Sequence, residues 1–282
     1  MSIVVNTNMS SVMVQRNIYN STNALTKSMQ KLSTGLKINS AGDDCAGLSL
    51  SEKLKANINS SDVARNNALT GINMLQTAES DLAIVQENLQ RMRDLAVQAA
   101  NGVYASSERS MLETEFATRM SEIDRIGQSS KFSDLNLLDG SLTSAELQIG
   151  TDSSEQSRID ISSAFTEVAA STIGASGSNF LDDATITTAA SARTAIDIVD
   201  AAISGLSLRR SNIGATINRL NSTVSRIDIR KENLAAANSV IRDTDIATET
   251  ANLTRLQILQ QAGGVLLRQA NQSTSMALSL LQ

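Results

Sequence analysis

The sequence predicts a mainly α-helical protein, an elongated antiparallel helical bundle or coiled coil built from both chain ends, with a small β-hairpin region in the middle. Apolar residues recur at alternating spacings of three and four in both halves, as in packed helices. The 282 residues include no proline, the residue that most strongly interrupts helices. Between the two halves, 17 of the 50 residues from 141 to 190 are Ser or Thr and the helical period is lost.

The amino-terminal segment, residues 1–42, is expected to form an amphipathic helix. Its apolar face includes Leu25, Leu32 and Leu36. Isolated helices of this length are marginally stable in water, so the segment needs a partner, and we expect it to be disordered in the free chain.

Residues 43–140 are predicted to hold a long helix and a shorter one. Asp43 or Asp44 begins the long helix, where a carboxylate suits the positive end of the helix dipole. The apolar positions of its heptads are Leu75, Ala78, Leu82, Val85, Leu89, Met92, Ala96 and Ala99. Asn101–Gly102 ends it, and a second helix follows from about Ser107, with Ser110 and Glu113 as a possible capping box.

Residues 141–192 are interpreted as an exposed Ser/Thr-rich excursion between the two helical arms, without a large core of its own. Alternating residues at 147–149 and 158–161 predict a short hairpin inside it. Asp182–Asp183 is assigned to this loop, since adjacent carboxylates without further ligands do not make a metal site.

Residues 193–242 carry the most regular heptads of the chain. Eleven of the fourteen core positions are apolar, the series being Ile196, Val199, Ile203, Leu206, Arg210, Ile213, Ile217, Leu220, Val224, Ile227, Lys231, Leu234, Asn238 and Ile241. The polar exceptions Arg210, Lys231 and Asn238 are of the kind that fixes helix register at some cost in stability. Residues 243–282 form a last amphipathic helix, whose apolar face includes Leu259, Leu266 and Leu280.

Composition excludes most enzyme chemistry, and we expect neither catalysis nor a cofactor. With no His and one Cys, the chain has no Ser-His-Asp triad, no His-ligated zinc site and no internal disulfide. A net charge of −5 disfavours nucleic-acid binding. No apolar run is long enough to cross a membrane, and no cleaved secretory peptide is expected.

Motifs in both arms resemble those of bacterial flagellins. They are LSTGLKINSAGDDCAGL at 32–48, LQRMRDLAVQAAN at 89–101, RDTDIATE at 242–249, QILQQAG at 257–263 and QANQ at 269–272. The resemblance covers about residues 3–140 and 206–282. It implies a short flagellin that lacks large outer domains and that polymerises into the filament of the bacterial flagellum, serving motility. The nearest alternative is a hook–filament junction protein, and the dense match of the carboxyl arm favours the bulk subunit.

The same resemblance implies where the parts pack and what they meet. The terminal helices would line an inner tube through Leu25, Leu32, Leu36, Leu259, Leu266 and Leu280. The rod helices would pack through Leu82, Val85, Leu89, Met92, Ile213, Ile217, Leu220, Val224 and Ile227. Expected partners are other copies of the chain, the flagellar cap and hook-associated proteins, and an export chaperone on the last helix. Export through the flagellum would place the protein outside the cell.

Two further expectations concern single positions. Arg91, Leu95 and Glu115 align with positions through which some flagellin monomers are recognised by a host flagellin-sensing Toll-like receptor, and ordinary rod packing is the alternative. Cys45 stands where the family motif usually has Ala. We expect a small buried side chain there, the alternative being a cross-link between subunits.

Overall fold

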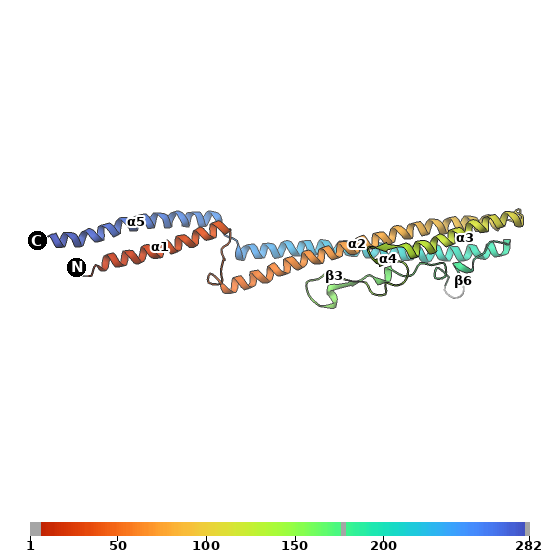
Figure 1. Ribbon diagram of the computed structural model, residues 1–282, viewed down its shortest axis with the longest axis horizontal. Helices are drawn as coiled ribbons and strands as arrows, with labels where there is room; N and C mark the ends of the chain where they lie inside the picture. Colours follow the sequence, from red (N-terminus) through yellow and green to blue (C-terminus); the bar gives the residue numbers. More distant parts are fainter. Residues whose placement is uncertain (1–6, 176–178, 280–282) are drawn as a thin grey trace. The chain divides into compact units, whose positions relative to one another are not determined.

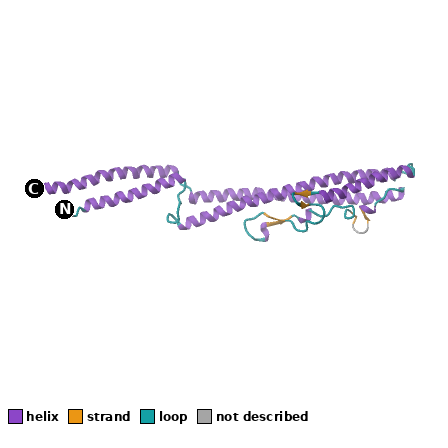
Figure 2. Cartoon of the chain, viewed as in Figure 1, coloured by secondary structure: helices purple, strands orange, loops and turns teal. Residues whose placement is uncertain are grey.

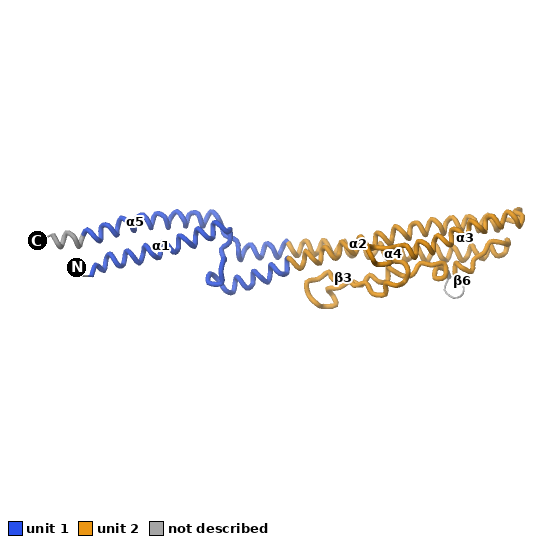
Figure 3. The backbone as a smooth tube through the Cα atoms, in the orientation of Figure 1, with its two compact units in different colours: residues 1–58, 232–282 blue, residues 59–231 orange. Residues whose placement is uncertain are grey.

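The computed structural model describes residues 7–175 and 179–279 and is dominated by five long helices (Figure 1). They are α1 (Met9–Thr34), α2 (Cys45–Ala99), α3 (Ser106–Ser129), α4 (Ala189–Arg242) and α5 (Ile246–Ser279). The chain forms two compact units (Figure 3). Residues 1–58 and 232–282 form unit 1, and residues 59–231 form unit 2. The predicted helical fold is confirmed.

Three short antiparallel hairpins lie between α3 and α4 (Figure 2). β1 (Lys131–Phe132) pairs with β2 (Leu135–Asn136), and β5 (Gly174–Ala175) pairs with β6 (Asn179–Phe180). Between them, β3 (Glu146–Gln148) pairs with β4 (Arg158–Asp160), with Leu147 opposite Ile159. The hairpin predicted from residue alternation is therefore confirmed.

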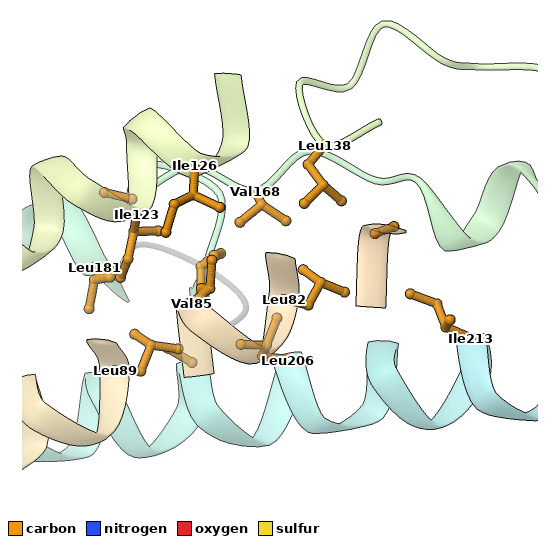
Figure 4. Packing of buried hydrophobic residues seen from close by; sticks show 14 of the residues in the cluster. Leu82, Val85, Leu89, Ile123, Ile126, Leu138, Val168, Leu181, Leu206 and Ile213 are labelled. Atoms are coloured by element: carbon orange, nitrogen blue, oxygen red, sulfur yellow. The ribbon is translucent and has the colours of Figure 1, made fainter. Parts of the chain in front are cut away.

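Unit 2 has one contiguous hydrophobic core. Figure 4 shows Leu82, Val85 and Leu89 of α2 converging on α3, α4 and the connecting segment. The segment from 131 to 188 belongs to this core, because Leu138, Ile159, Phe165, Val168 and other apolar side chains in it are buried in the same cluster. The exposed excursion expected between the arms is thus wrong for its apolar residues. Those side chains pack onto the helices, while most of its described Ser and Thr side chains are exposed.

In unit 1, α1 packs along α5. Gly35 ends α1 with φ 71°, a left-handed conformation that glycine adopts without strain, and its N–H donates to the Lys31 carbonyl. The segments that follow α1 and α4 then meet as a short antiparallel bridge between Leu36 and Asp243. The Lys37 N–H donates to the Arg242 carbonyl, and the Thr244 N–H donates to the Gly35 carbonyl.

The cap predicted for the start of α2 is confirmed, and the one predicted for α3 is not. Asp44 caps α2 by accepting the Gly47 N–H at 2.9 Å, as the acidic pair predicted. The capping box proposed for Ser110 and Glu113 is wrong. α3 begins one turn earlier, and Glu108 reaches back to accept the Ala105 N–H at 2.8 Å. Glu113 instead accepts the Ile186 N–H at 2.6 Å, which anchors the segment entering α4.

Cys45, the first residue of α2, is exposed. The expectation of a small buried side chain was therefore wrong. The reason is its place at the helix start beside the capping Asp44, outside the packed seam of α2 that forms further along the chain.

Candidate packing and recognition surfaces

The seam between α2 and α4 in unit 2 uses the predicted heptad positions. Leu82, Val85, Leu89 and Met92 of α2 are no more than 1% exposed. On α4, Ile213, Leu220 and Ile227 are buried, while Ile217 and Val224 are half-buried against the same cluster. These side chains lie where a rod core requires them, and each fully buried Leu, Ile or Val contributes about 1.5–3 kcal/mol relative to exposure.

The polar heptad positions of α4 each meet a polar partner on α2. Arg210 Nη2 lies 2.6 Å from Glu79 Oε1, and Lys231 Nζ lies 2.6 Å from Asp62 Oδ1 in unit 2. In unit 1, the hydroxyl of Ser51 donates to Asn238 Oδ1 at 2.7 Å. Residue numbers rise on α2 as they fall on α4, which is the antiparallel register. A shift of one helix along the other would separate all these partners, so they specify the register.

Further ion pairs flank this seam in unit 2. Arg65 pairs with Asp228 at 2.9 Å, and the guanidinium of Arg93 pairs with Asp200 at 2.5 Å. Both pairs are well exposed and contribute little to stability singly, so their main effect is to disfavour other alignments of the two helices.

The three recognition candidates are brought close together, but only two of them reach the surface. Arg91 of α2 forms two hydrogen bonds with the Glu115 carboxylate of α3, at 2.8 and 3.0 Å. The hydrogen bond from Arg91 lowers the pKa of Glu115, so the pair stays charged at neutral pH. Leu95 is fully buried in the core, so a partner that binds this surface would meet Arg91 and Glu115 while Leu95 supports the helix from below.

The terminal helices leave many large apolar side chains exposed within one chain. Leu25, Leu32 and Leu36 are half-buried, whereas Leu259 is 50% and Leu266 is 57% exposed; Leu280 lies outside the described residues. Other large apolar side chains exposed on α1 and α5 are Met9, Val12, Met13, Tyr19, Met29, Ile246, Ile258 and Val265. No apolar side chain that the structure describes on either helix is buried.

Polar contacts also join these two helices. The Ser28 hydroxyl donates to Glu249 Oε1 at 2.5 Å, and Gln260 donates to the Thr22 hydroxyl oxygen at 3.3 Å. At Gly263 a Cβ would lie 2.7 Å from Ile18 Cγ1, so this glycine allows the two helices to approach closely. The pairing of α1 with α5 is therefore close but poor in apolar burial.

No catalytic arrangement appears in the parts of the chain that the structure describes. In them, no three His, Cys, Asp or Glu side chains gather as metal ligands, and no helix has a stretch long and apolar enough to span a bilayer. Helices that bury heptad seams and expose apolar terminal faces define a structural protein, one built to pack against other helices.

Comparisons with known proteins identify the family. The bacterial flagellin N-terminal helical region matches residues 5–143, and the bacterial flagellin C-terminal helical region matches residues 196–281. The chain therefore belongs to the flagellins, which are structural proteins and not enzymes.

Relatives match along the whole chain. A flagellin of Halalkalibacterium halodurans is 40% identical, covering 99% of this chain and 100% of the relative. The flagellar filament 33 kDa core protein of Treponema phagedenis is 37% identical with the same coverage. Among solved structures, a putative flagellar hook-associated protein from Vibrio parahaemolyticus has a TM-score of 0.58 over 71% of this chain and 99% of its own, at 16% identity. That likeness shows a shared fold alone.

Proposed function

We propose that this protein is the bulk subunit of a flagellar filament and that α1 and α5 pack against the same helices of neighbouring copies. The observation that carries this is the uncovered apolar surface of both terminal helices, including Leu259 and Leu266. Because no apolar side chain of α1 or of residues 246–272 of α5 is buried, other copies supply the missing burial. Contacts that join different surfaces of successive copies give an open helical polymer.

Polymerisation onto short seeds tests this proposal. Full-length protein should extend filament fragments, as seen by electron microscopy, whereas chains trimmed of residues 1–40 or 243–282 should not. A matched control reverses the exposed ion pair between Glu122 and Arg125 of α3, which lies outside the terminal helices. Equal growth of trimmed and full-length chains would contradict the proposal.

The hook–filament junction role predicts a different number of copies of this chain in each filament. A junction protein occupies few positions at one interface, whereas a bulk subunit makes up nearly the whole filament. Protein composition of purified filaments separates the two, and filaments composed almost wholly of this chain are expected.

The remaining partners follow from the same proposal. An export chaperone would bind α5 before assembly. The cap and hook-associated proteins would contact the apolar terminal helices at the end of assembly. Export through the flagellum would place the protein outside the cell. Export can be tested by deleting the flagellar export apparatus. The protein should then be absent from the medium and the cell surface.

We also propose that Arg91 and Glu115 contribute to recognition by a host flagellin-sensing Toll-like receptor. Their mutual hydrogen bonds complicate a single substitution, because Arg91→Glu also breaks the pair. The double exchange R91E/E115R restores opposite charges within the chain while reversing both charges seen by a partner. Both variants should lose receptor activation by the monomer, and the equivalent exchange E122R/R125E should not. Undiminished activation by R91E/E115R would overturn this role.

A further inference from the structure

Several arginines of α4 in unit 2 form no ion pair among the described residues, and two of them, Arg219 and Arg226, lie seven residues apart. Arg219 and Arg226 are exposed, and in the described part of the chain neither has a carboxylate within 4.0 Å. By contrast, Arg65, Arg93 and Arg210 in the same unit are all ion-paired. Residues seven apart lie on one side of a helix, about 10.5 Å apart along its axis.

These arginines line a groove between α4 and the β3–β4 hairpin. A hollow of about 360 Å³ is bounded by Arg219, Ser222, Thr223 and Arg226 of α4 and by Ile149, Gln156 and Ile159. A neighbouring hollow of about 290 Å³ shares Ile149, Gln156 and Arg226 and adds Arg230. The floor is apolar and the rim offers guanidinium, hydroxyl and amide donors. Such a groove favours carboxylates, which guanidinium groups bind in a two-pronged geometry.

The Asp152 carboxylate of the hairpin is already engaged within its own loop. Hydrogen bonds from Ser154 and Ser157, and more weakly the charge of Arg230, lower the pKa of Asp152. Asp152 already accepts hydrogen bonds from both serines, so its carboxylate is fixed within the hairpin loop. Arg219 and Arg226 are left for an external acidic group.

The same unit carries two exposed carboxylates with matching spacing. Glu87 and Asp94 of α2 are also seven residues apart, and in the described residues neither has a cationic group within 4.0 Å. Arg91 and Arg93, which neighbour Asp94 in sequence, are committed to Glu115 and Asp200. Among the described residues, neither set of charges has an ion-pair partner within 4.0 Å, and the charge of Asp94 acts on Arg91 and Arg93 only as a minor influence that raises their pKa.

We propose that the groove at Arg219 and Arg226 receives the α2 face bearing Glu87 and Asp94 from a second copy of this chain. The inference rests on the filament function proposed above and assigns one of its contacts to unit 2. The two arginines on α4 and the two carboxylates on α2 have the same spacing of seven residues. When the two helices lie side by side, both ion pairs can therefore form at once, whether the helices run parallel or antiparallel. The contact joins two different surfaces, the groove of one copy and the α2 face of the next. Each pair of copies therefore keeps one free groove and one free α2 face, and further copies can add to form an open polymer.

Charge reversal tests the contact in the full-length chain, with elongation of wild-type seeds as the readout. R219E/R226E should elongate at least about tenfold more slowly than wild type, which corresponds to about 1.4 kcal/mol. E87R/D94R should show the same loss. An equal mixture of the two variants should recover elongation, because each groove then faces a surface of opposite charge and the two variants alternate.

The controls separate this contact from folding and from the function itself. K131E/R193E makes the same change of net charge on exposed residues of unit 2 and should elongate normally. Helical circular dichroism of every variant should match wild type. If wild-type protein fails to elongate, the filament function itself is refuted. If wild type elongates and R219E/R226E does so equally, or if the mixture gives no recovery, the contact is refuted.

A different occupant gives a different result. If R219E/R226E elongates normally but no longer binds immobilised heparin, used as a sulfated polyanion, the groove serves an external polyanion. That outcome also overturns the proposal.

Discussion

Gly127 of α3 lies directly against the connecting segment. A Cβ at this position would lie 1.9 Å from the carbonyl oxygen of Val168, a backbone atom that cannot rotate away. Gly127→Ala should therefore lower the free energy of unfolding, by about 1–3 kcal/mol as in other overpacked cores. Urea unfolding followed by circular dichroism measures the change.

Gly214 of α4 provides the matched control. Nothing lies within 4 Å of the position its Cβ would take. Gly214→Ala should raise stability by up to about 1 kcal/mol, because alanine favours a helix interior over glycine. A Gly127→Ala chain as stable as the Gly214→Ala chain would show that the Val168 segment is free to move away from α3.

Asp245 makes the start of α5 sensitive to acid. It accepts hydrogen bonds from the Thr248 hydroxyl and from the N–H groups of Ala247 and Thr248, and these lower its pKa. A carboxyl whose pKa is lower in the folded state stabilises that state above its ordinary pKa of about 3.9, and this is lost as pH falls through the folded value.

The measurement compares wild type with Asp245→Asn, which keeps a side-chain oxygen at the cap but does not titrate. The stability advantage of wild type in urea should be constant above about pH 5 and should vanish in stronger acid. A difference that stays constant throughout the acid titration would show that Asp245 does not carry this dependence.

At the scale of helices, the pair formed by Ser51 and Asn238 is one of the polar contacts in the seam between α2 and α4. Ser51 is fully buried, and its hydroxyl donates to Asn238 at 2.7 Å. Asn238→Ala should therefore cost about 1–3 kcal/mol, the cost of leaving a buried donor unpaired. Removing both partners in S51A/N238A should recover part of this loss. A double-mutant cycle in urea measures the coupling, and strict additivity would mean that the two side chains act independently.

Heptad reasoning predicted the α2 and α4 seams because packing follows a period that is visible in the sequence. All fourteen predicted core positions from Ile196 to Ile241 are buried or half-buried, and the eight from Leu75 to Ala99 are all buried. The sequence also predicted that the polar exceptions fix the register. It did not predict their partners Ser51, Asp62 and Glu79. Those partners depend on the alignment of two helices that are far apart in sequence.

The segment between α3 and α4 was not predictable in the same way. Its buried residues, such as Phe165 and Val168, are scattered among Ser and Thr without a period. Their burial is decided by contacts with distant helices, including the Asp124 carboxylate that accepts the Ala170 N–H at 2.7 Å. Leu95 shows the same limit of sequence-based prediction for a candidate site. The motif identifies Leu95 as a candidate but does not say whether its side chain faces the core or the solvent.

At the scale of the whole protein, the distribution of burial separates the terminal helices from the rest. Unit 2 contains nearly all of the buried apolar residues whose burial the structure describes, whereas α1 and residues 246–272 of α5 contain none. Helices that bury so little gain little from tertiary packing, which supplies most helical stability in proteins. Regions of this kind open locally at low free energy while a well-packed core stays closed.

Limited proteolysis should therefore distinguish the free chain from the filament. In the monomer, residues 1–40 and 243–282 should be removed first, leaving a resistant fragment that contains residues 59–231. In filaments the same ends should resist cleavage, because neighbouring copies cover Leu259, Leu266 and the other exposed apolar side chains. Sampling both forms at equal protease concentration, with mass spectrometry of the products, gives the order of cuts. Ends that resist cleavage in the monomer as strongly as in the filament would mean that α1 and α5 are already stable as a pair.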